Sequence, residues 1–361
     1  MNTQRIIIPE AWSLCVLAGL AGVTLVQQAT AQEAYVMTDL GTLPGLANSF
    51  IYAGETLNNR GHVAVTANNI GPFYVDGDAA YLWTGPGSIQ ILPGLPGADR
   101  TDAYGLNNHD QIVGESGGSN LQAWYPVVWD HGVIYNLGIP PGDAGTSASA
   151  INDSGVIVGT TTTTDFGLIR AVAWYDRQLT ILPSLPGAAF TQANAINDRG
   201  QIVGGSGPDY WAHYHAVIWD RGTITDLGTL GGLASLAWGI GDKGQVVGQA
   251  QTAAGEWHST LWQNGNTIDL GEFGSDSWGV VSAINSHGQM VGISMSADGS
   301  ISRGLLWENG SAIDLQTLIP PNSGWVIQQA LGINDQGQID GQGLINGQTH
   351  AFLLSPVSGA K

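Results

Sequence analysis

One short motif recurs seven times along the chain, and this internal repeat constrains the fold more than any other feature of the sequence. The motif is typified by Ile196-Asn197-Asp198-Arg199-Gly200, and successive copies begin about 45 residues apart. The seven copies begin at Leu57, Leu106, Ile151, Ile196, Ile240, Ile284 and Ile333. Self-similarity at such a period is typical of solenoids and propellers, in which each repeat is one supersecondary unit that packs on its neighbours.

Turn signals and short apolar runs predict four strands in each repeat. The Asn-Asp-x-Gly part of the motif predicts a hairpin turn, because Asn and Asp bond to their own backbone and Gly adopts a positive φ without penalty. A second tight turn is predicted at Trp219-Asp220-Arg221-Gly222. Short β-branched runs flank both turns and predict strands. Four short strands in about 45 residues are typical of one propeller blade.

The two ends of the chain are out of phase with the repeat. Tyr35–Leu40 supplies a fourth-strand element with no third strand before it, and His350–Leu354 supplies a third strand with no fourth after it. Together they would complete one blade and remove exposed strand edges, whereas the alternative, an open solenoid, usually carries atypical capping repeats. We therefore predict an all-β fold, a seven-bladed β-propeller of four-stranded blades closed by the N-terminal strand that completes the last blade.

The first 31 residues have the pattern of a signal peptide. Arg5 precedes an apolar stretch, Ala11–Val26, and Ala29-Thr30-Ala31 has the small-x-small pattern of a cleavage site. The alternative is an uncleaved anchor, but the stretch is shorter than the ~20 residues that a spanning helix needs. We expect a signal peptide at 1–31, one propeller domain at 32–356 and a short tail at 357–361. The protein is then exported, to the periplasm or the medium.

The charge and the cysteine content limit the partners and the cofactors. The chain has 29 acidic and 10 basic residues, a net charge of -19, which repels phosphate backbones and anionic lipids. We expect no nucleic-acid partner and no membrane insertion after the signal is cleaved. The single cysteine, Cys15, lies inside the expected signal, so neither disulfides nor Cys-bound metals stabilise the mature chain.

The repeat resembles that of the extracellular HAF repeat proteins. The motifs that carry the resemblance are His215-Ala216-Val217-Ile218-Trp219, Asp226-Leu227-Gly228-Thr229-Leu230-Gly231-Gly232 and Ile196–Gly204, and it covers nearly the whole mature chain. It implies a bacterial exported repeat protein and assigns no catalytic residue. The chain departs from the pattern where Ala79, Tyr125, Arg170 and Arg303 replace the motif's His, and where Leu354 replaces its Trp.

Repeated polar residues suggest metal sites, but their spacing favours structural roles. His215, His258 and His350 share one repeat position and therefore lie on different blades, too far apart for metal–nitrogen bonds of ~2 Å. We expect them to be hydrogen-bonded within their own blades. The Asn-Asp turns lack the spacing of a calcium loop. Asp76 and Asp78 form a close carboxylate pair in a long loop, a weak metal candidate. We predict no metal and no cofactor.

Tryptophans and loop carboxylates leave two further possibilities open. Six Trp residues end an apolar strand at a fixed phase, which favours a core between blades over a ligand-binding ladder: Trp83, Trp129, Trp174, Trp219, Trp262 and Trp307. Paired carboxylates for glycoside cleavage remain possible among loop residues: Asp102, Asp143, Asp165, Asp209, Glu256 and Asp276. No nucleophile with a partnered base is evident from the sequence, so the catalytic residues are unknown.

The variable connections predict the working face. The connections between second and third strands, and between fourth and first strands, are long and differ between repeats, and they emerge on the same face. Loops on a rigid scaffold usually carry binding, and aromatic side chains suit sugar rings or protein hot spots. Segment Asp209–Tyr214 is the densest aromatic cluster. The predicted ligand-binding residues are Tyr210, Trp211, Tyr214, Trp257, Trp278 and Trp325.

These observations predict a secreted or periplasmic scaffold that binds a glycan or protein ligand through its variable-loop face. One alternative is a propeller hydrolase or lyase that acts on polysaccharide, and another is a structural component of the cell surface. The alternatives differ in what they require. An enzyme should bring two carboxylates together at the mouth of the central channel, and a binding protein should present aromatic and amide side chains without them. A structural component should self-associate.

Overall fold

The computed structural model describes residues 34–52, 54–69, 77–118, 123–164, 167–209 and 213–357. The expected signal peptide, most of the expected tail and the candidate residues Tyr210 and Trp211 lie outside the described residues. Within the described part of the chain, no helix is long and apolar enough to cross a membrane.

The described residues form 28 β-strands and one short 3-10 helix, η1(Leu315–Leu318). Five sheets have four strands, and a sixth has eight. The eight-stranded sheet consists of two four-stranded halves that are joined by one parallel bridge, between Ile169 and Phe190. Inside each group of four, neighbouring strands pair antiparallel: β6(Arg100–Leu106) pairs with β7(Ile112–Gly118), and β7 pairs with β8(Ala123–Asp130). The prediction of an all-β chain with four strands for each repeat is therefore confirmed.

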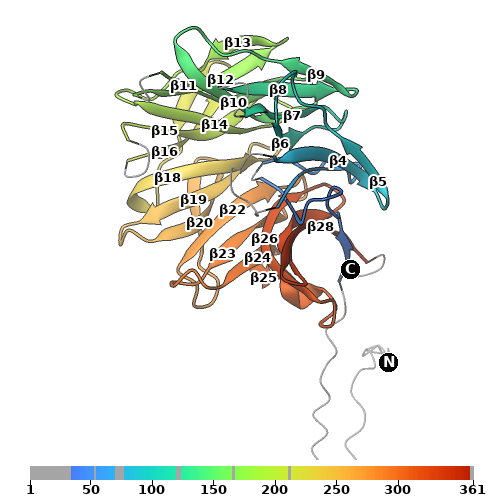
Figure 1. The fold of residues 1–361 in the computed structure, drawn as a ribbon. Helices are drawn as coiled ribbons and strands as arrows, with labels where there is room; N and C mark the ends of the chain where they lie inside the picture. Colours follow the sequence, from blue (N-terminus) through green and yellow to red (C-terminus); the bar gives the residue numbers. More distant parts are fainter. Residues whose placement is uncertain are drawn as a thin grey trace, which may run out of the picture. The chain divides into compact units, whose positions relative to one another are not determined.

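We number the four-stranded groups as units 1 to 7 in the order of their first strands along the chain (Figure 1). The first strands are β2(Asn48–Phe50), β6(Arg100–Leu106), β10(Asp143–Ile151), β14(Phe190–Ile196), β18(Gly231–Ile240), β22(Trp278–Ile284) and β26(Trp325–Ile333). The second strands are β3(Val63–Asn68), β7(Ile112–Gly118), β11(Ile157–Thr163), β15(Ile202–Gly207), β19(Val246–Thr252), β23(Met290–Met295) and β27(Ile339–Ile345).

The third and fourth strands complete the units. The third strands are β4(Ala79–Gly85), β8(Ala123–Asp130), β12(Ile169–Tyr175), β16(His215–Asp220), β20(Trp257–Gln263), β24(Ser302–Glu308) and β28(Gln348–Pro356). The fourth strands are β5(Ser88–Ile91), β9(Val133–Asn136), β13(Gln178–Ile181), β17(Thr223–Asp226), β21(Asn266–Gly271), β25(Ser311–Asp314) and, for unit 7, β1(Tyr35–Asp39).

The first strand of the described chain lies in the same sheet as the last. β1 pairs antiparallel with β28, in a register that sets Tyr35 opposite Pro356 and Asp39 opposite Phe352, and Figure 1 shows the blue N-terminal strand beside the red β28. Unit 1 also contacts unit 7. The backbone N–H of Ala351 donates to Ser49 Oγ at 3.1 Å, and Thr56 Oγ1 donates to Asp340 Oδ2 at 2.7 Å.

The apolar core lies between consecutive units. One cluster combines Val158 of unit 3 with Trp219 of unit 4, and another combines Leu353 of unit 7 with Trp83 of unit 1. The third-strand tryptophans are buried, with exposed fractions of 6% for Trp83, 1% for Trp129, 0% for Trp174, 2% for Trp219, 3% for Trp262 and 5% for Trp307. The interpretation of these residues as core between blades is confirmed.

The predicted turns are present. Gly200 adopts a φ of 76° in the Asn-Asp-x-Gly turn of unit 4, and Arg221 and Gly222 adopt φ values of 50° and 79° in the second turn. Two consecutive positive φ values match the twist of a two-residue hairpin. One expectation fails in unit 7. The connection from β27 to β28 is not long, because Asn346 and Gly347 form the same kind of tight turn, with φ values of 52° and 80°.

Candidate functional site

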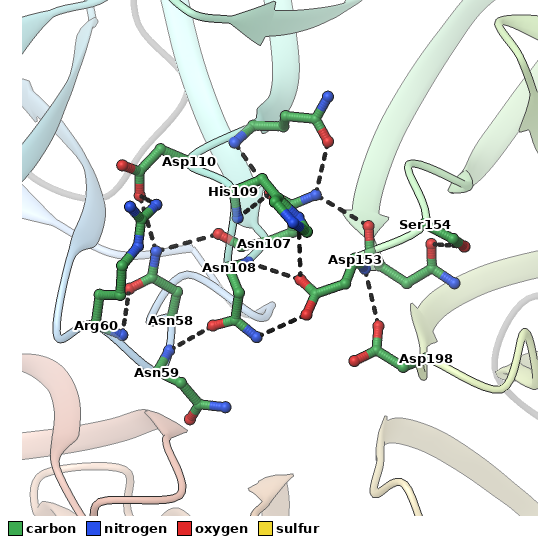
Figure 2. Close-up of polar contacts among 12 residues, drawn as sticks. Asn58, Asn59, Arg60, Asn107, Asn108, His109, Asp110, Asp153, Ser154 and Asp198 are labelled. Atoms are coloured by element: carbon green, nitrogen blue, oxygen red, sulfur yellow. Dashed lines mark hydrogen bonds and ion pairs between the residues drawn. The ribbon is translucent and has the colours of Figure 1, made fainter.

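A ring of buried Asn side chains connects the Asn-Asp turns of neighbouring units. In unit 2, Asn107 Oδ1 accepts hydrogen bonds from the backbone N–H of His109 and Gln111, both at 3.0 Å. Its Nδ2 donates to the carbonyl of Asn152 in unit 3 at 3.0 Å (Figure 2). The Nδ2 of Asn334 in unit 7 donates in the same way to the carbonyl of Asn58 in unit 1, also at 3.0 Å. Each side chain thus fixes its own turn and the next unit.

We call this set the turn ring. Its members are Asn58, Asn107, Asn152, Asn197, Asn285 and Asn334, all at most 4% exposed. Unit 5 has Gly241 at this position, so the turn ring has a gap there. A second set of contacts runs beside it. The backbone N–H of Asn108 donates to Asp153 Oδ1 at 2.8 Å, and the N–H of Asp153 donates to Asp198 Oδ1 at 2.8 Å (Figure 2).

The turns surround a central cavity of about 130 Å³, which residues of all seven units line. Glu55, from the segment between β2 and β3, also lines the cavity. Burial, together with the charges of Asp198, Asp242 and Asp153, raises the pKa of Glu55 to about 8. Among the described residues, no three His, Cys, Asp or Glu side chains are arranged to hold a metal ion. Many of the polar contacts of the turns around this cavity connect one unit to the next.

The three repeat histidines lie where the sequence predicts. His215 Nδ1 is 2.7 Å from Asp226 Oδ2, His258 Nδ1 is 2.9 Å from Asp269 Oδ1, and His350 Nδ1 is 3.0 Å from Asp39 Oδ2. Each pair connects the third and fourth strands of one unit. The expectation that these histidines are hydrogen-bonded within their own blades is confirmed.

The loop carboxylates that were candidates for glycoside cleavage lie in separate units. Asp143 in unit 3 pairs with Arg170 at 2.5 Å, and Asp209 in unit 4 pairs with His213 at 2.7 Å. Asp276, at the start of unit 6, accepts a hydrogen bond from Ser294 Oγ at 2.5 Å. Glu256 in unit 5 is exposed and lies 4.0 Å from His258. Asp165 and Asp76 lie outside the described residues.

Asp102, the remaining candidate, belongs to a buried ionic cluster in units 1 and 2. Arg100 Nε lies 2.6 Å from Asp102 Oδ2 and 3.1 Å from Asp78 Oδ2, and both carboxylate side chains are 0% exposed. The Arg100 guanidinium lies over the Trp124 ring, 4.7 Å from its centroid. Burial raises the pKa of Asp102 to about 7, against the opposing effect of Arg100. Because these carboxylates are enclosed, the cluster is suited to joining strands rather than to contacting a substrate.

A second, smaller cavity lies between units 4 and 5, and it contains two of the predicted ligand-binding residues. Its volume is about 40 Å³. We call it the amide pocket, and it is lined by Gln192, Tyr214, Ser235, Leu236, Trp238, Gln249 and Trp257. Unit 4 contributes Gln192 from β14 and Tyr214, which immediately precedes β16; the other five residues come from β18, β19 and β20 of unit 5.

A glycine and a serine fix the tyrosine wall of the amide pocket. A Cβ at Gly205 would lie 1.8 Å from Cε1 of Tyr214, so glycine at this position of β15 lets the ring lie against the strand. The backbone N–H of Ser235 donates to the Tyr214 carbonyl at 2.6 Å. Ser235 Oγ accepts from the N–H of Ala216 at 2.9 Å and donates to the carbonyl of Gly228 at 2.7 Å. These bonds join unit 5 to unit 4 at the edge of the cavity.

Two buried polar atoms of the amide pocket have unused hydrogen-bonding capacity. Gln249 is 6% exposed, and its Oε1 has no hydrogen-bond partner among the described residues. The same holds for the buried Nε1 of Trp238. Buried polar atoms are normally paired. Gln249 and Trp238 both line the amide pocket, and Trp238 also lines the central cavity. An unpaired acceptor and an unpaired donor on two residues of one pocket make it a candidate ligand site. None of the described residues that line the pocket is Asp, Glu, Lys, Arg or His.

The sequence identified the amide pocket only in part. Tyr214 and Trp257 line it, whereas Trp278 and Trp325 do not. Trp325 is 7% exposed and packs edge-on against Phe352, with ring centroids 6.0 Å apart, in its own unit. Sequence reasoning missed Gln192, Gln249 and Trp238. The signal for Trp238 is a departure from the repeat: it occupies the bulge between Ala237 and Gly239, where unit 4 has Asn194.

Comparison with known proteins defines the fold class. Neither a protein-family model nor a curated protein sequence matches the chain. The structure is similar to an oligogalacturonate lyase in complex with manganese, with a TM-score of 0.51 and 10% identity over 89% of this chain and 93% of that chain. It is also similar to the acylaminoacyl peptidase of Pyrococcus horikoshii, with a TM-score of 0.54 and 9% identity over 85% of this chain and 52% of that chain.

A looser similarity is to TolB from Acinetobacter baumannii, with a TM-score of 0.41 and 10% identity over 78% of this chain and 60% of that chain. The chain thus spans little more than half of TolB and of the peptidase. The structural neighbours with TM-scores above 0.5, the lyase and the peptidase, are propeller-type proteins. At such low identity the similarity defines the fold alone: this chain is an all-β protein of the propeller type.

Proposed function

We propose that the chain is an exported member of the HAF repeat family, folded as a closed seven-bladed propeller. The pairing of β1 with β28 and the hydrogen bonds between units 7 and 1 support closure. A core cluster that is shared by these two units supports it as well. The signal-like residues 1–31 and the repeat motifs support export and the family assignment.

The function that we propose is the binding of an uncharged glycan or protein segment at the amide pocket. One observation carries this proposal: Trp257, Trp238 and Tyr214 surround a cavity in which the buried Gln249 has an unused acceptor. This is the combination of aromatic and amide groups that a binding protein requires, without a carboxylate. An aromatic ring offers flat apolar area to a sugar or a peptide group, and an amide fixes its orientation by hydrogen bonds.

A binding screen of the mature protein tests this function. Residues 32–361 would be applied to a glycan array and to a peptide array, and each positive ligand would be measured by calorimetry. Trp257→Ala should abolish measurable binding at nearly unchanged melting temperature. Trp278→Ala is the matched control, because Trp278 is also half-buried at a strand start but does not line the pocket. If both variants bind like wild type, the ligand binds elsewhere.

A polysaccharide-acting enzyme remains the alternative function, and one structural neighbour is a lyase that acts on an oligogalacturonate. A net charge of -19 repels polyuronates, which favours neutral ligands for this chain. Incubation of the mature protein with polysaccharides separates the two functions. An enzyme releases shortened products, whereas a binding protein retains the ligand unchanged. Self-association at micromolar concentration would instead favour a structural component of the cell surface.

A further inference from the structure

The size of the amide pocket limits what can enter it. The cavity has a volume of about 40 Å³, and one water needs roughly 10–15 Å³ on this scale. A group of a few heavy atoms therefore fills the pocket, and a sugar ring does not fit. The ring of a bound sugar would remain outside the cavity and send one substituent into it. Trp257 is only half-buried and begins β20, so part of its surface stays available to that ring.

The polar atoms of the pocket select among small substituents. Trp238 Nε1 acts only as a hydrogen-bond donor, and Gln249 Oε1 acts only as a hydrogen-bond acceptor. If the Gln249 amide is turned by 180°, the side chain still presents one donor and one acceptor at its end. A substituent that satisfies both residues needs its own acceptor and its own N–H or O–H donor. The rest of the lining includes Leu236, Tyr214 and Trp257, which favours an apolar remainder such as a methyl group.

The charge of the lining excludes ionised substituents. Among the described residues that line the pocket, none is acidic or basic. A free ammonium or carboxylate group would lose its water there without gaining a counter-ion, which is strongly unfavourable. The substituent must therefore be neutral. A hydroxymethyl group is neutral but brings no methyl group for the apolar wall. An acetamido group has a carbonyl acceptor, an N–H donor and a methyl group on four heavy atoms.

We infer that the amide pocket binds the acetamido group of a 2-acetamido sugar, with Gln249 and Trp238 pairing its N–H and carbonyl and Trp257 stacking on the sugar ring. The inference rests on the proposed binding function and names the class of glycan. It predicts that the protein distinguishes an acetylated amino sugar from the same sugar with a free amine. The difference arises because the free amine is charged and has neither a carbonyl nor a methyl group.

The direct experiment compares two ligands of equal length with the full mature protein. Tri-N-acetylchitotriose and chitotriose, its deacetylated form, are titrated by calorimetry at the same pH and salt concentration. We expect at least tenfold tighter binding of the acetylated trimer. In saturation-transfer NMR, the acetyl methyl protons should receive more saturation than the ring protons. Equal affinity for both trimers, or stronger saturation of the ring protons, would overturn the inference.

Single substitutions test whether the tighter binding of the acetylated trimer arises in the amide pocket. Gln249→Leu removes the buried acceptor and should weaken binding of the acetylated trimer about tenfold, since one hydrogen bond is lost from a buried site. The control is Gln342→Leu, because Gln342 has the same position on the second strand of unit 7 and is equally buried, at 6% exposure. If Gln249→Leu unfolds, Trp257→Ala replaces it. An unchanged affinity in the folded pocket variant contradicts the inference.

The inference and the proposed function can fail separately. Binding of neutral glycans that lack acetamido groups, lost in Trp257→Ala, would support the function and refute the inference. Binding of peptides alone, also lost in Trp257→Ala, would likewise support the function and refute an acetamido sugar as the ligand. Binding of no glycan and no peptide would refute both.

Discussion

The turn ring and the amide pocket differ in where their residues stand relative to the repeat. The turn ring uses a position that has the same residue, Asn, in six of the seven turns. Each of these side chains makes the same contacts, as Asn107 and Asn152 illustrate. The amide pocket uses positions at which the units differ, although unit 7 also has a glutamine, Gln342, at the position of Gln249. Trp238 stands where unit 4 has Asn194, and Gln249 stands where unit 4 has Gly205.

This difference shows how one repeat can both join the units and provide a ligand-binding site. Contacts that recur around the ring join the units and fix their register, and no single copy can acquire a ligand-specific role without weakening the ring. Specific chemistry arises where one unit departs from the pattern. Asp340 is another such departure: it stands where unit 4 has Val203, and like that residue it is 0% exposed. We expect the largest losses of stability where the units join, and smaller effects at single departures.

Removal of the N-terminal strand tests the junction with the largest expected effect. Deleting Ala34–Leu40 removes β1, exposes the edge of β28 and uncovers a core to which Leu40 and Tyr35 contribute, at 1% and 7% exposure. We expect a loss of several kcal/mol of the usual ~5–15 kcal/mol, together with aggregation through the free edge. Thermal unfolding and light scattering measure both. An unchanged melting temperature would show that units 7 and 1 do not depend on this strand.

Asp340 makes the same junction sensitive to pH. Burial raises the pKa of Asp340 from 3.8 to about 7, and the hydrogen bond from Thr56 opposes this only partly. Between about pH 4 and pH 7 the folded protein keeps the proton that the unfolded chain has lost. Stability therefore falls as the pH rises through this window, by a few kcal/mol in order of magnitude. Above pH 7 the loss is complete and constant.

Asp340→Asn imitates the protonated carboxyl group and should remove this contribution. Denaturant unfolding at pH 5 and pH 8 measures the stability of wild type and variant. We expect wild type to be less stable at pH 8 than at pH 5, and the variant to lose only the share of that difference that belongs to Asp340. Glu55 and Asp102 have pKa values that burial raises to about 8 and about 7, so a smaller slope of the same sign should persist. Equal slopes in the two proteins would contradict the assignment to Asp340.

The sequence predicts the features that depend on neighbouring residues along the chain. The hairpin turns, the four strands of each unit and the phase of Trp219 follow from local patterns. The hydrogen bond of His215 within its unit follows from them as well. The amide pocket could not be predicted in full, because it depends on how β18 and β15 approach each other and on the bulge that turns Trp238. The cross-unit bond of Asn107 was missed for a related reason, since a turn motif does not show which carbonyl of another unit lies opposite its side chain.

A single member of the turn ring should have an intermediate effect. Asn152→Ala removes the acceptor for the N–H of Val156 at 2.9 Å and for Ser154 Oγ at 2.8 Å. It also removes the donor to the carbonyl of Asn197 at 3.1 Å. Because the site is buried, we expect a loss of about 2–3 kcal/mol, near 1 kcal/mol for each bond. Ser154→Ala is the control and should cost less than about 1 kcal/mol by denaturant unfolding. If both variants lose equally little, the contacts between units do not depend on the Asn side chains.

The gap in the turn ring allows the smallest and most specific test. Gly241 has the turn geometry of the other units: its N–H donates to the Gln245 carbonyl at 2.9 Å, and its carbonyl accepts from Gly244 at 2.8 Å. A Cβ at this position would lie 3.5 Å from Ile284 Cγ2 and 4.0 Å from the Asn285 carbonyl oxygen, which is ordinary contact. Gly241→Asn should therefore place an amide that donates to Asn285, as Asn197 Nδ2 donates to Gly241 at 3.1 Å. We expect a gain of about 0.5–1.5 kcal/mol from the new bonds and the less flexible unfolded chain.

Gly241→Ala is the matched control, because it changes the backbone freedom without adding an amide. Greater stability of the Asn variant than of the Ala variant supports a ring of independent joints, whereas a loss in the Asn variant alone would mean that unit 5 is built to lack this contact.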